Sequence, residues 1–209
     1  MDIVQIPEAQ IAQGIKQAAA LLDAGKKQSL AIAPWAAFPY KPTVNFSIAH
    51  YQHGIALKFY VEEASIRAAN TNINGSIWED SCVEFFLQFE GDAGYYNLEF
   101  NCTGTGLTGY GPSKKERALL PAHIVQQIKA MALIYSSEEN MRRWELTLLI
   151  PVSVFIHSNL KLLTGVSCKA NFYKCGDLLP QPHFLVWAPV NTPAPNFHVP
   201  ESFIKISFL

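Results

Sequence analysis

Two alternating runs joined by a short loop lie between Trp78 and Asn101, and they restrict the possible folds more than any other part of the chain. In residues 82–89 and again in residues 96–101, apolar side chains occupy every second position and mostly polar ones lie between them. This period of two, interrupted by the sequence EGDAG, is typical of a β-hairpin. Its apolar row must face a core. The opposite row contains the polar residues Glu84, Gln88, Asn97, Glu99 and Asn101.

Alternation of this kind recurs along the rest of the chain. Five further runs show it: residues 43–50, 54–62, 144–150, 165–174 and 203–208. Residues 124–135 fit either a helix or a strand, and we expect a strand because the sheets need partners. Residues 7–24 predict one helix, since apolar side chains recur every three to four positions before a stop at Gly25.

These elements predict an all-β fold class. About ten short strands with close turns favour a two-sheet antiparallel β-sandwich, with one peripheral N-terminal helix. A chain of 209 residues without a visible linker or repeat fits a single domain over residues 1–209. Hydrophobic residues make up 49% of the chain and charged residues 16%, so a sizeable core can form.

The net charge and the targeting signals of the sequence limit the classes of binding partner and the cellular location that we expect. The formal net charge of -1 favours neither nucleic acid nor an anionic membrane surface. No apolar run approaches the ~18 residues of a transmembrane helix. The first ten residues lack the basic and apolar regions of a signal peptide. We expect a cytoplasmic protein, or an exported one if a leader has been removed.

The four cysteines lack the close pairing of a zinc site, and we expect them to be reduced. Three of them lie in expected strands, where buried free thiols are common. Cys175 and His183, with Asp177 between them, could seed a thiol or metal site. Nothing at ligand spacing supports such a site, so a buried thiol and a loop histidine are favoured.

Three irregular segments flank the expected strands. The segment PWAAFPYKP at residues 34–42 holds three prolines, so it is no central strand, and we expect its aromatic side chains to cover the core. The glycine-dense residues 104–111 lack the flanking strand and helix of a phosphate-binding loop, so a mobile loop or bulged edge is expected. Residues 114–117 are charged and favour a solvated surface, from which Arg117 could reach back to a site.

The polar row of the hairpin follows Trp78 closely, and this combination suggests saccharide binding. A sugar ring presents C–H groups on its faces and hydroxyls around its edge. Tryptophan supplies flat apolar area, while Glu and Asn side chains supply directional hydrogen bonds. The alternative is that the indole covers the core and the polar row faces solvent. Lys169, on the polar side of a further strand, is expected to pair with Glu84 or Glu99.

Six motifs follow one another along the chain: PWAAFPYKP, WEDSCVEFF, YYNLEFNCTGT, ANFYKCGD, PHFLVWAPV and PNFHVPESFIKISF. From Trp35 onward the chain resembles the carbohydrate-binding module family 9-like domains, in particular their stand-alone bacterial group. The resemblance implies a β-sandwich of immunoglobulin-like or jelly-roll type, a saccharide ligand and a link to carbohydrate catabolism. It also implies possible structural calcium, although no calcium ligand set maps onto this sequence residue by residue.

In the xylanase-attached modules of that family, two tryptophans hold the reducing end of a saccharide. They map onto Trp78 and Trp187, and the glutamate of the motif D-S-V-E maps onto Glu84. A polar position of the next strand maps onto Asn97, where those modules carry arginine. The expected ligand-binding residues are Trp78, Trp187, Glu84, Asn97, Glu99, Asn101 and Lys169.

Two other functions stay open beside non-catalytic saccharide binding. Glu84 and Glu99 on neighbouring strands would suit the carboxyl pair of a glycoside hydrolase, although a nearby lysine would oppose the raised pKa that the acid needs. Sandwiches of related architecture carry haem in some redox proteins, but the histidines and methionines form no recognisable axial pair. A scaffold or interaction domain is the last alternative. The sequence therefore favours a saccharide-binding protein without catalytic residues.

Overall fold

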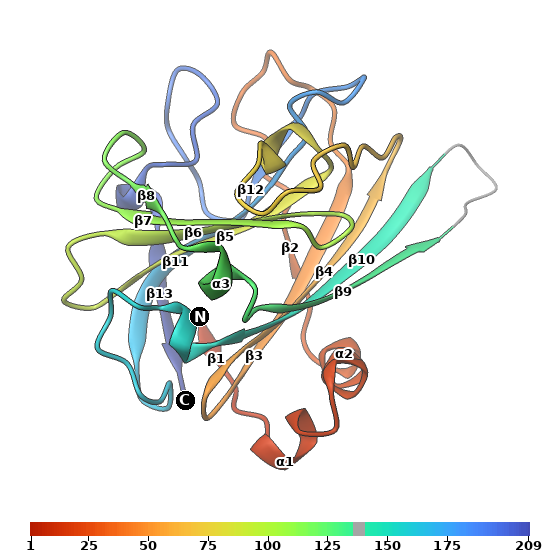
Figure 1. Ribbon diagram of the computed structural model, residues 1–209. Coiled ribbons are helices and arrows are strands. Elements are labelled where there is room, and N and C mark those ends of the chain that lie inside the picture. The colour runs from red at the N-terminus through yellow and green to blue at the C-terminus, as the bar shows by residue number, and fades with distance from the viewer. Residues whose placement is uncertain (136–140) are drawn as a thin grey trace.

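The computed structural model describes residues 1–135 and 141–209, which form two β-sheets packed face to face (Figure 1). The first sheet has the order β1 (Asp2–Ile3), β13 (Ile204–Phe208), β11 (Ser167–Cys175), β5 (Cys82–Phe89), β6 (Tyr95–Asn101), β7 (Gly106–Gly111) and β8 (Ala118–Leu119), with β12 (Phe184–Val186) paired to β11. The second sheet has the order β2 (Gln28–Ser29), β3 (Thr43–Tyr51), β4 (Gly54–Glu63), β10 (Arg142–Pro151) and β9 (Lys129–Tyr135). The predicted two-sheet sandwich is confirmed; β1 and β13 form a parallel pair among otherwise antiparallel neighbours.

The hairpin of β5 and β6 lies in the middle of the first sheet, and its register matches the alternation of the sequence. Phe85 faces Leu98 across the two strands, and Glu84 faces Glu99. The apolar row packs into the core between the sheets, where Phe85 stacks on Phe172 of β11 at 4.6 Å between ring centroids. Phe172 in turn stacks on Phe46 of the second sheet at 3.9 Å. The hairpin therefore forms the centre of the core, as its apolar row predicts.

The opposite face of the first sheet is buried as well, which the alternation does not reveal. A second apolar cluster covers it, formed by Trp35, Phe86, Tyr173, Phe197 and Phe203 together with smaller side chains. Its covering residues come from the loops gathered at the upper end of the molecule in Figure 1. Trp35 is buried there, which confirms that residues 34–42 cover a core. The polar row of the hairpin consequently lies beneath loops, not on an open sheet face.

The predicted N-terminal helix is wrong as a single element, because the chain forms α1 (Glu8–Ile11) and α2 (Ile15–Ala24). The break falls at Gly14, whose φ of 104° lies in the region that side chains disfavour. Ala18 and Leu22 of α2 pack on the outer face of the second sheet, beside Ala56. The other helical elements are short: α3 (Ala122–Val125), η1 (Ile77–Glu79), η2 (Val152–Val154) and η3 (Pro200–Ser202). In the described part of the chain, no helix combines the length and the apolar character that crossing a bilayer requires.

Most of the glycine-dense residues 104–111 form a strand, so of the two expectations, a mobile loop or a bulged edge, the mobile loop was wrong. Residues Gly106–Gly111 make β7, which is mostly buried between β6 and β8. A Cβ atom on Gly106 would lie 2.4 Å from the ring of Phe100, and one on Gly109 would lie 2.7 Å from Oδ1 of Asn97. The glycines therefore permit close packing against the side chains of β6.

A charged cluster lies between α2 and the outer face of the second sheet. Nζ of Lys58 lies 2.7 Å from Oδ1 of Asp23 and 2.8 Å from Oε2 of Glu145, and Arg143 also pairs with Glu145. Burial by itself would raise the pKa of Glu145, but the hydrogen bonds and charges of Lys58 and Arg143 hold that pKa below its ordinary value. The folded state therefore binds fewer protons at Glu145 than the unfolded chain does at acid pH.

Replacing Glu145 by glutamine should lower the free energy of unfolding by about 2 kcal/mol at neutral pH, since charge-assisted hydrogen bonds are lost. A carboxyl group whose pKa is lower in the folded than in the unfolded state stabilises the fold at pH values above its unfolded-state pKa. This contribution is lost as the pH falls through the folded-state pKa. The difference between wild type and Glu145→Gln should therefore shrink at about pH 3. Urea unfolding at both pH values checks this, with exposed Glu62→Gln on β4 as the control. A difference that stays constant with pH would contradict it.

Candidate functional site

A pocket of about 210 Å³ opens on the outer face of the first sheet. Its floor is formed by three adjacent strands, which contribute Glu84 from β5, Glu99 from β6 and Cys175 from β11. All three side chains are buried, and Glu84 and Glu99 are only 3% and 2% exposed. The pocket thus ends on a polar floor beside the second apolar cluster, and a concave site with convergent polar groups is typical of small-molecule binding.

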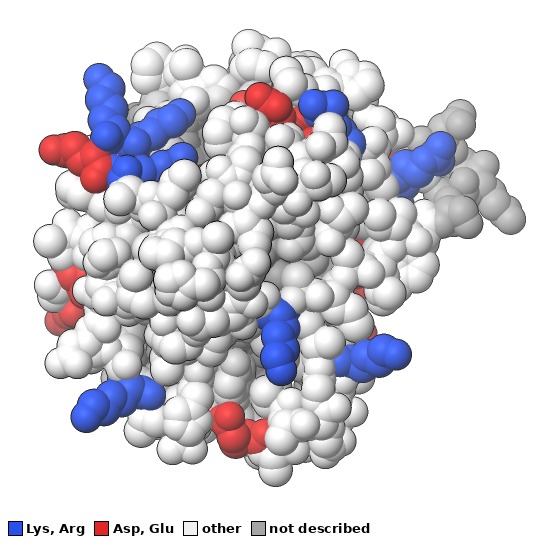
Figure 2. All heavy atoms as spheres, viewed as in Figure 1, with Lys and Arg blue, Asp and Glu red and all other residues white. Residues whose placement is uncertain are grey.

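The walls of the pocket come mostly from the connections between strands, together with η1 and β12. Lys114 and Arg117 come from the connection between β7 and β8, and Asp177 lies two residues after the end of β11. Trp78, Phe184 and Phe197 add aromatic surface, and Pro195, Asn196 and His198 complete the lining. Figure 2 shows few charged side chains on this face of the molecule. Several Lys and Arg side chains and one acidic side chain lie together at its upper left, near the β7–β8 connection. A positively charged rim beside buried carboxyls gives the pocket both donors and acceptors.

The two carboxyl groups on the floor determine its electrostatics. Burial raises the pKa of Glu84 well above its ordinary value, and the neighbouring Glu99 raises it further. Burial also raises the pKa of Glu99, but Arg117 opposes that rise from 3.3 Å away. The arrangement favours a proton on Glu84 and the negative charge on Glu99, because two adjacent carboxylates do not both ionise readily.

Arg117 is held by groups on both of its sides. Its guanidinium donates to Oε1 of Glu99 and, at 3.1 Å, to Nε2 of His198. Burial and the charge of Arg117 lower the pKa of His198 to about 3, so the imidazole is neutral and can accept this bond. The other ring nitrogen then carries the proton and donates to the hydroxyl of Tyr95 at 2.8 Å. Arg117 is therefore fixed in place without a second carboxylate bonded to it.

Trp78 enters the pocket from η1, and its backbone is fixed on both sides. The carbonyl of Trp78 accepts hydrogen bonds from the thiol of Cys175 and from the amide of Asp177. Two residues later, buried Asp80 accepts bonds from the amides of Ala69 and Asn70. These contacts hold the half-buried indole at the pocket wall. The motif WEDS thus places Trp78 through its backbone and its aspartate.

Trp187 lies elsewhere. Its ring packs edge-on against Phe46 and Phe172, at 5.8 and 5.5 Å between centroids, and it borders the core between the two sheets. It does not belong to the lining of the pocket that holds Trp78. The aromatic side chains that share the pocket with Trp78 are Phe184 and Phe197. Two tryptophans far apart in sequence were expected to converge, and the structure brings only Trp78 to this pocket.

Of the other residues expected to bind the ligand, two support pocket residues through hydrogen bonds and one lies away from the pocket. Asn97 donates from Nδ2 to Oε1 of Glu99 at 2.8 Å and so orients that carboxyl from beneath. Asn101 donates to Asp80 and to the carbonyl of Asn70, which supports the loop before Trp78. Lys169 faces Gln88 in the strand register and borders a different cavity. The expected pairing of Lys169 with Glu84 or Glu99 was wrong, because Arg117 supplies the cation.

Several pocket residues were not expected from the sequence. His198, Phe197 and Asp177 lie in irregular segments, where no periodicity indicates the direction of a side chain. The available signals were indirect. Asp177 lies two residues after a strand that neighbours the hairpin, and the motif PNFHVP is too rich in proline to be a strand. Arg117, which was expected to be able to reach a site, does so.

Calcium does not suit the ligands that the structure assembles. In residues 1–135 and 141–209, the side chains grouped closely enough to hold a metal ion are Cys82, Glu84 and Cys175. Calcium takes six to eight oxygen ligands, whereas two of these three groups are thiols. Both oxygens of Asp80, a plausible hard ligand, already accept backbone hydrogen bonds. Among the described residues, the side chains grouped in this way therefore do not fit calcium.

Comparisons with known proteins agree with this architecture. The family model described as carbohydrate-binding family 9 matches residues 16–208. A crystal structure described as a "putative carbohydrate-binding protein" from Bacteroides uniformis ATCC 8492 is 37% identical, with a TM-score of 0.92 over 100% of this chain and 98% of the other. No curated protein matches the chain.

Two more distant structures share the fold. Both are family 9 carbohydrate-binding modules from Caldicellulosiruptor kristjanssonii at 11% identity. The structure in complex with glucose has a TM-score of 0.54 and covers 90% of this chain and 86% of its own. The structure in complex with cellotriose has a TM-score of 0.57 and covers 100% of this chain and 93% of its own. At this identity they support the sandwich architecture alone. Because the family model spans nearly the whole chain, this protein belongs to carbohydrate-binding family 9.

Proposed function

We propose that the protein binds a saccharide without catalysis, in the pocket between Trp78 and the pair Glu84–Glu99, and that it acts in carbohydrate catabolism. The observation that carries the proposal is the combination of a half-buried indole with buried, hydrogen-bonded carboxyls in one small pocket. Membership of a carbohydrate-binding family and the description of its 37% identical relative support it.

The pocket matches the chemistry of a sugar ring. Trp78 and Phe197 offer apolar area to the C–H faces of the ring. Glu99 and Arg117 offer an anionic acceptor and a cationic donor to its hydroxyls, and a protonated Glu84 both donates and accepts. The volume of about 210 Å³ is below the ~300–1,000 Å³ of pockets for larger ligands, which favours one sugar unit or a chain end.

Replacing Trp78 by alanine should weaken binding about tenfold, equivalent to 1.4 kcal/mol, because stacking area is lost. Isothermal titration against a panel of mono- and oligosaccharides measures this. Trp78→Phe should retain part of the affinity, and Trp187→Ala is the matched control because Trp187 packs on the core instead. The proposal fails if wild type binds nothing on a broad panel, or if Trp78→Ala binds like wild type.

The glycoside-hydrolase alternative uses the same two carboxyls and is tested in the same samples. Glu84, with its raised pKa, has the property expected of a general acid. Chromatography of an oligosaccharide after prolonged incubation should show unchanged chain length if the pocket only binds. Cleavage that disappears in Glu84→Gln would favour the enzyme instead.

A further inference from the structure

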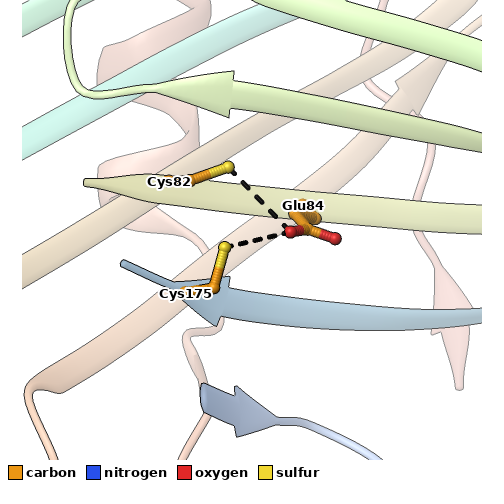
Figure 3. Close-up of side chains that lie close together, drawn as sticks. All are labelled: Cys82, Glu84 and Cys175. Carbon is orange, nitrogen blue, oxygen red and sulfur yellow. Dashed lines mark hydrogen bonds between the residues drawn. The ribbon is translucent and has the colours of Figure 1, made fainter. Parts of the chain in front are cut away.

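Two thiols and a carboxyl converge at the floor of the pocket, on strands β5 and β11 (Figure 3). Cys82 and Cys175 lie directly opposite each other in the strand register. Sγ of Cys175 lies 3.1 Å from Oε1 of Glu84, and Sγ of Cys82 lies 4.0 Å from the same oxygen. All three ligand atoms lie within 4.8 Å of one another. Figure 3 shows one carboxyl oxygen directed at the sulfurs and the other directed away from them.

We propose that Cys82, Glu84 and Cys175 form a binding site for a thiophilic divalent cation such as Zn²⁺. Tetrahedral Zn²⁺ with bonds of about 2.3 Å to sulfur and about 2.0 Å to oxygen separates sulfur from oxygen by about 3.5 Å. The two observed separations, 3.1 and 4.0 Å, lie on either side of that value. Small side-chain rotations therefore suffice to bring all three atoms onto one ion.

The mixture of ligands determines the class of metal. Thiolates favour Zn²⁺ and other soft or borderline cations, and a single carboxylate oxygen is compatible with them. Binding forms two metal–sulfur bonds and one metal–oxygen bond and releases the thiol protons, together with any proton on Glu84, to solvent.

The pocket gives the metal ion its route to the three ligands and also borders the fourth coordination position of the ion. Cys82 is fully buried, but Glu84 and Cys175 line the pocket, so an ion can reach the cluster from that side. Three protein ligands leave a fourth position for water or a ligand hydroxyl, as in open zinc sites. The second oxygen of Glu84 stays free for the pocket. The metal site therefore shares Glu84 with the proposed saccharide site, but the metal proposal rests on the geometry of the cysteines and not on saccharide binding.

The test uses the full chain, reduced and stripped of metal with a chelator. Cobalt(II) should bind one ion per chain and produce sulfur-to-cobalt charge-transfer absorption, and Zn²⁺ should displace it. Cys82→Ser and Cys175→Ser should each weaken Zn²⁺ binding about 100-fold or more, since each removes a thiolate ligand. Cys168→Ser is the matched control, because Cys168 is also a buried strand cysteine but lies in the core between the sheets.

Glu84→Gln replaces the carboxylate ligand by a neutral, more weakly binding amide with little change of shape, so it should also weaken Zn²⁺ binding and keeps the test valid if a serine variant does not fold. Circular dichroism of each variant verifies the fold. The proposal is overturned if reduced wild type takes up no cobalt, if the charge-transfer band is absent, or if the serine variants bind Zn²⁺ as the control does. A Cys82–Cys175 disulfide that persists under reducing conditions, detected by mass spectrometry, would also overturn it. Saccharide titration of the metal-free protein tests the other proposal separately.

Discussion

Replacing Lys174 by methionine is expected to lower the free energy of unfolding by about 3–5 kcal/mol, the largest effect on stability that we predict. The side chains of Lys174 and Glu63 are both 0% exposed and lie 2.9 Å apart between the two sheets. Without the ammonium group, the carboxylate of Glu63 stays buried and unpaired. Urea unfolding at neutral pH measures the change.

The surroundings of Lys174 explain why the effect should be large. The ammonium group donates to the carbonyl of Cys175 and to Nε2 of His183, each at 2.8 Å. Burial and the charge of Lys174 lower the pKa of His183 to about 4, which keeps the imidazole neutral and able to accept. The other oxygen of Glu63 accepts from the indole of Trp144 at 2.6 Å. The ammonium group therefore makes two hydrogen bonds and one buried ion pair.

Lys169→Met provides the control for this prediction. Lys169 lies on the same strand but is exposed, so its replacement should change stability by no more than about 0.5 kcal/mol. The double variant Glu63→Leu with Lys174→Met removes both charges and should lose less than the sum of the single changes. A Lys174→Met protein that unfolds at the same urea concentration as Lys169→Met would contradict the prediction.

Replacing Arg117 by methionine is expected to weaken saccharide binding about 30- to 100-fold, or roughly 2–3 kcal/mol, because charge-assisted hydrogen bonds contribute about that much. Arg117 is the cation that pairs with Glu99 in the pocket, and its side chain is only 15% exposed. Without it, Glu99 retains the amide of Asn97 as its donor. The site would then lose both a donor to the ligand and the partner that orients its acceptor.

Lys115→Met is the matched control, since Lys115 lies in the same loop but is exposed and outside the pocket. Arg117→Lys should bind with intermediate affinity, because an ammonium keeps the positive charge but lacks the additional N–H donors of the planar guanidinium. Thermal unfolding of each variant separates lost affinity from lost structure. Equal affinities for Arg117→Met and Lys115→Met would rule out this role for Arg117.

The candidate site was predictable from the sequence where it lies on strands. Glu84 and Glu99 follow from alternation within one hairpin, and their side chains meet because cross-strand neighbours lie about 5 Å apart. Trp78 follows from its position next to that hairpin. His198 and Phe197 reach the pocket from a segment nearly 100 residues further along the chain. Only long-range packing decides such contacts.

The sequence by itself determined the sandwich, the core-facing row of β5 and β6, and the two pocket carboxyls, because a period of two fixes which face each strand residue occupies. Tertiary structure alone decided the rest. It broke the N-terminal helix at Gly14, ordered residues 106–111 as a strand, and placed Trp187 against Phe46 instead of in the pocket. It also covered the polar row with loops and brought the free thiols of Cys82 and Cys175 together. The physical reason is that loop residues carry no periodicity, so their contacts follow from what they pack against.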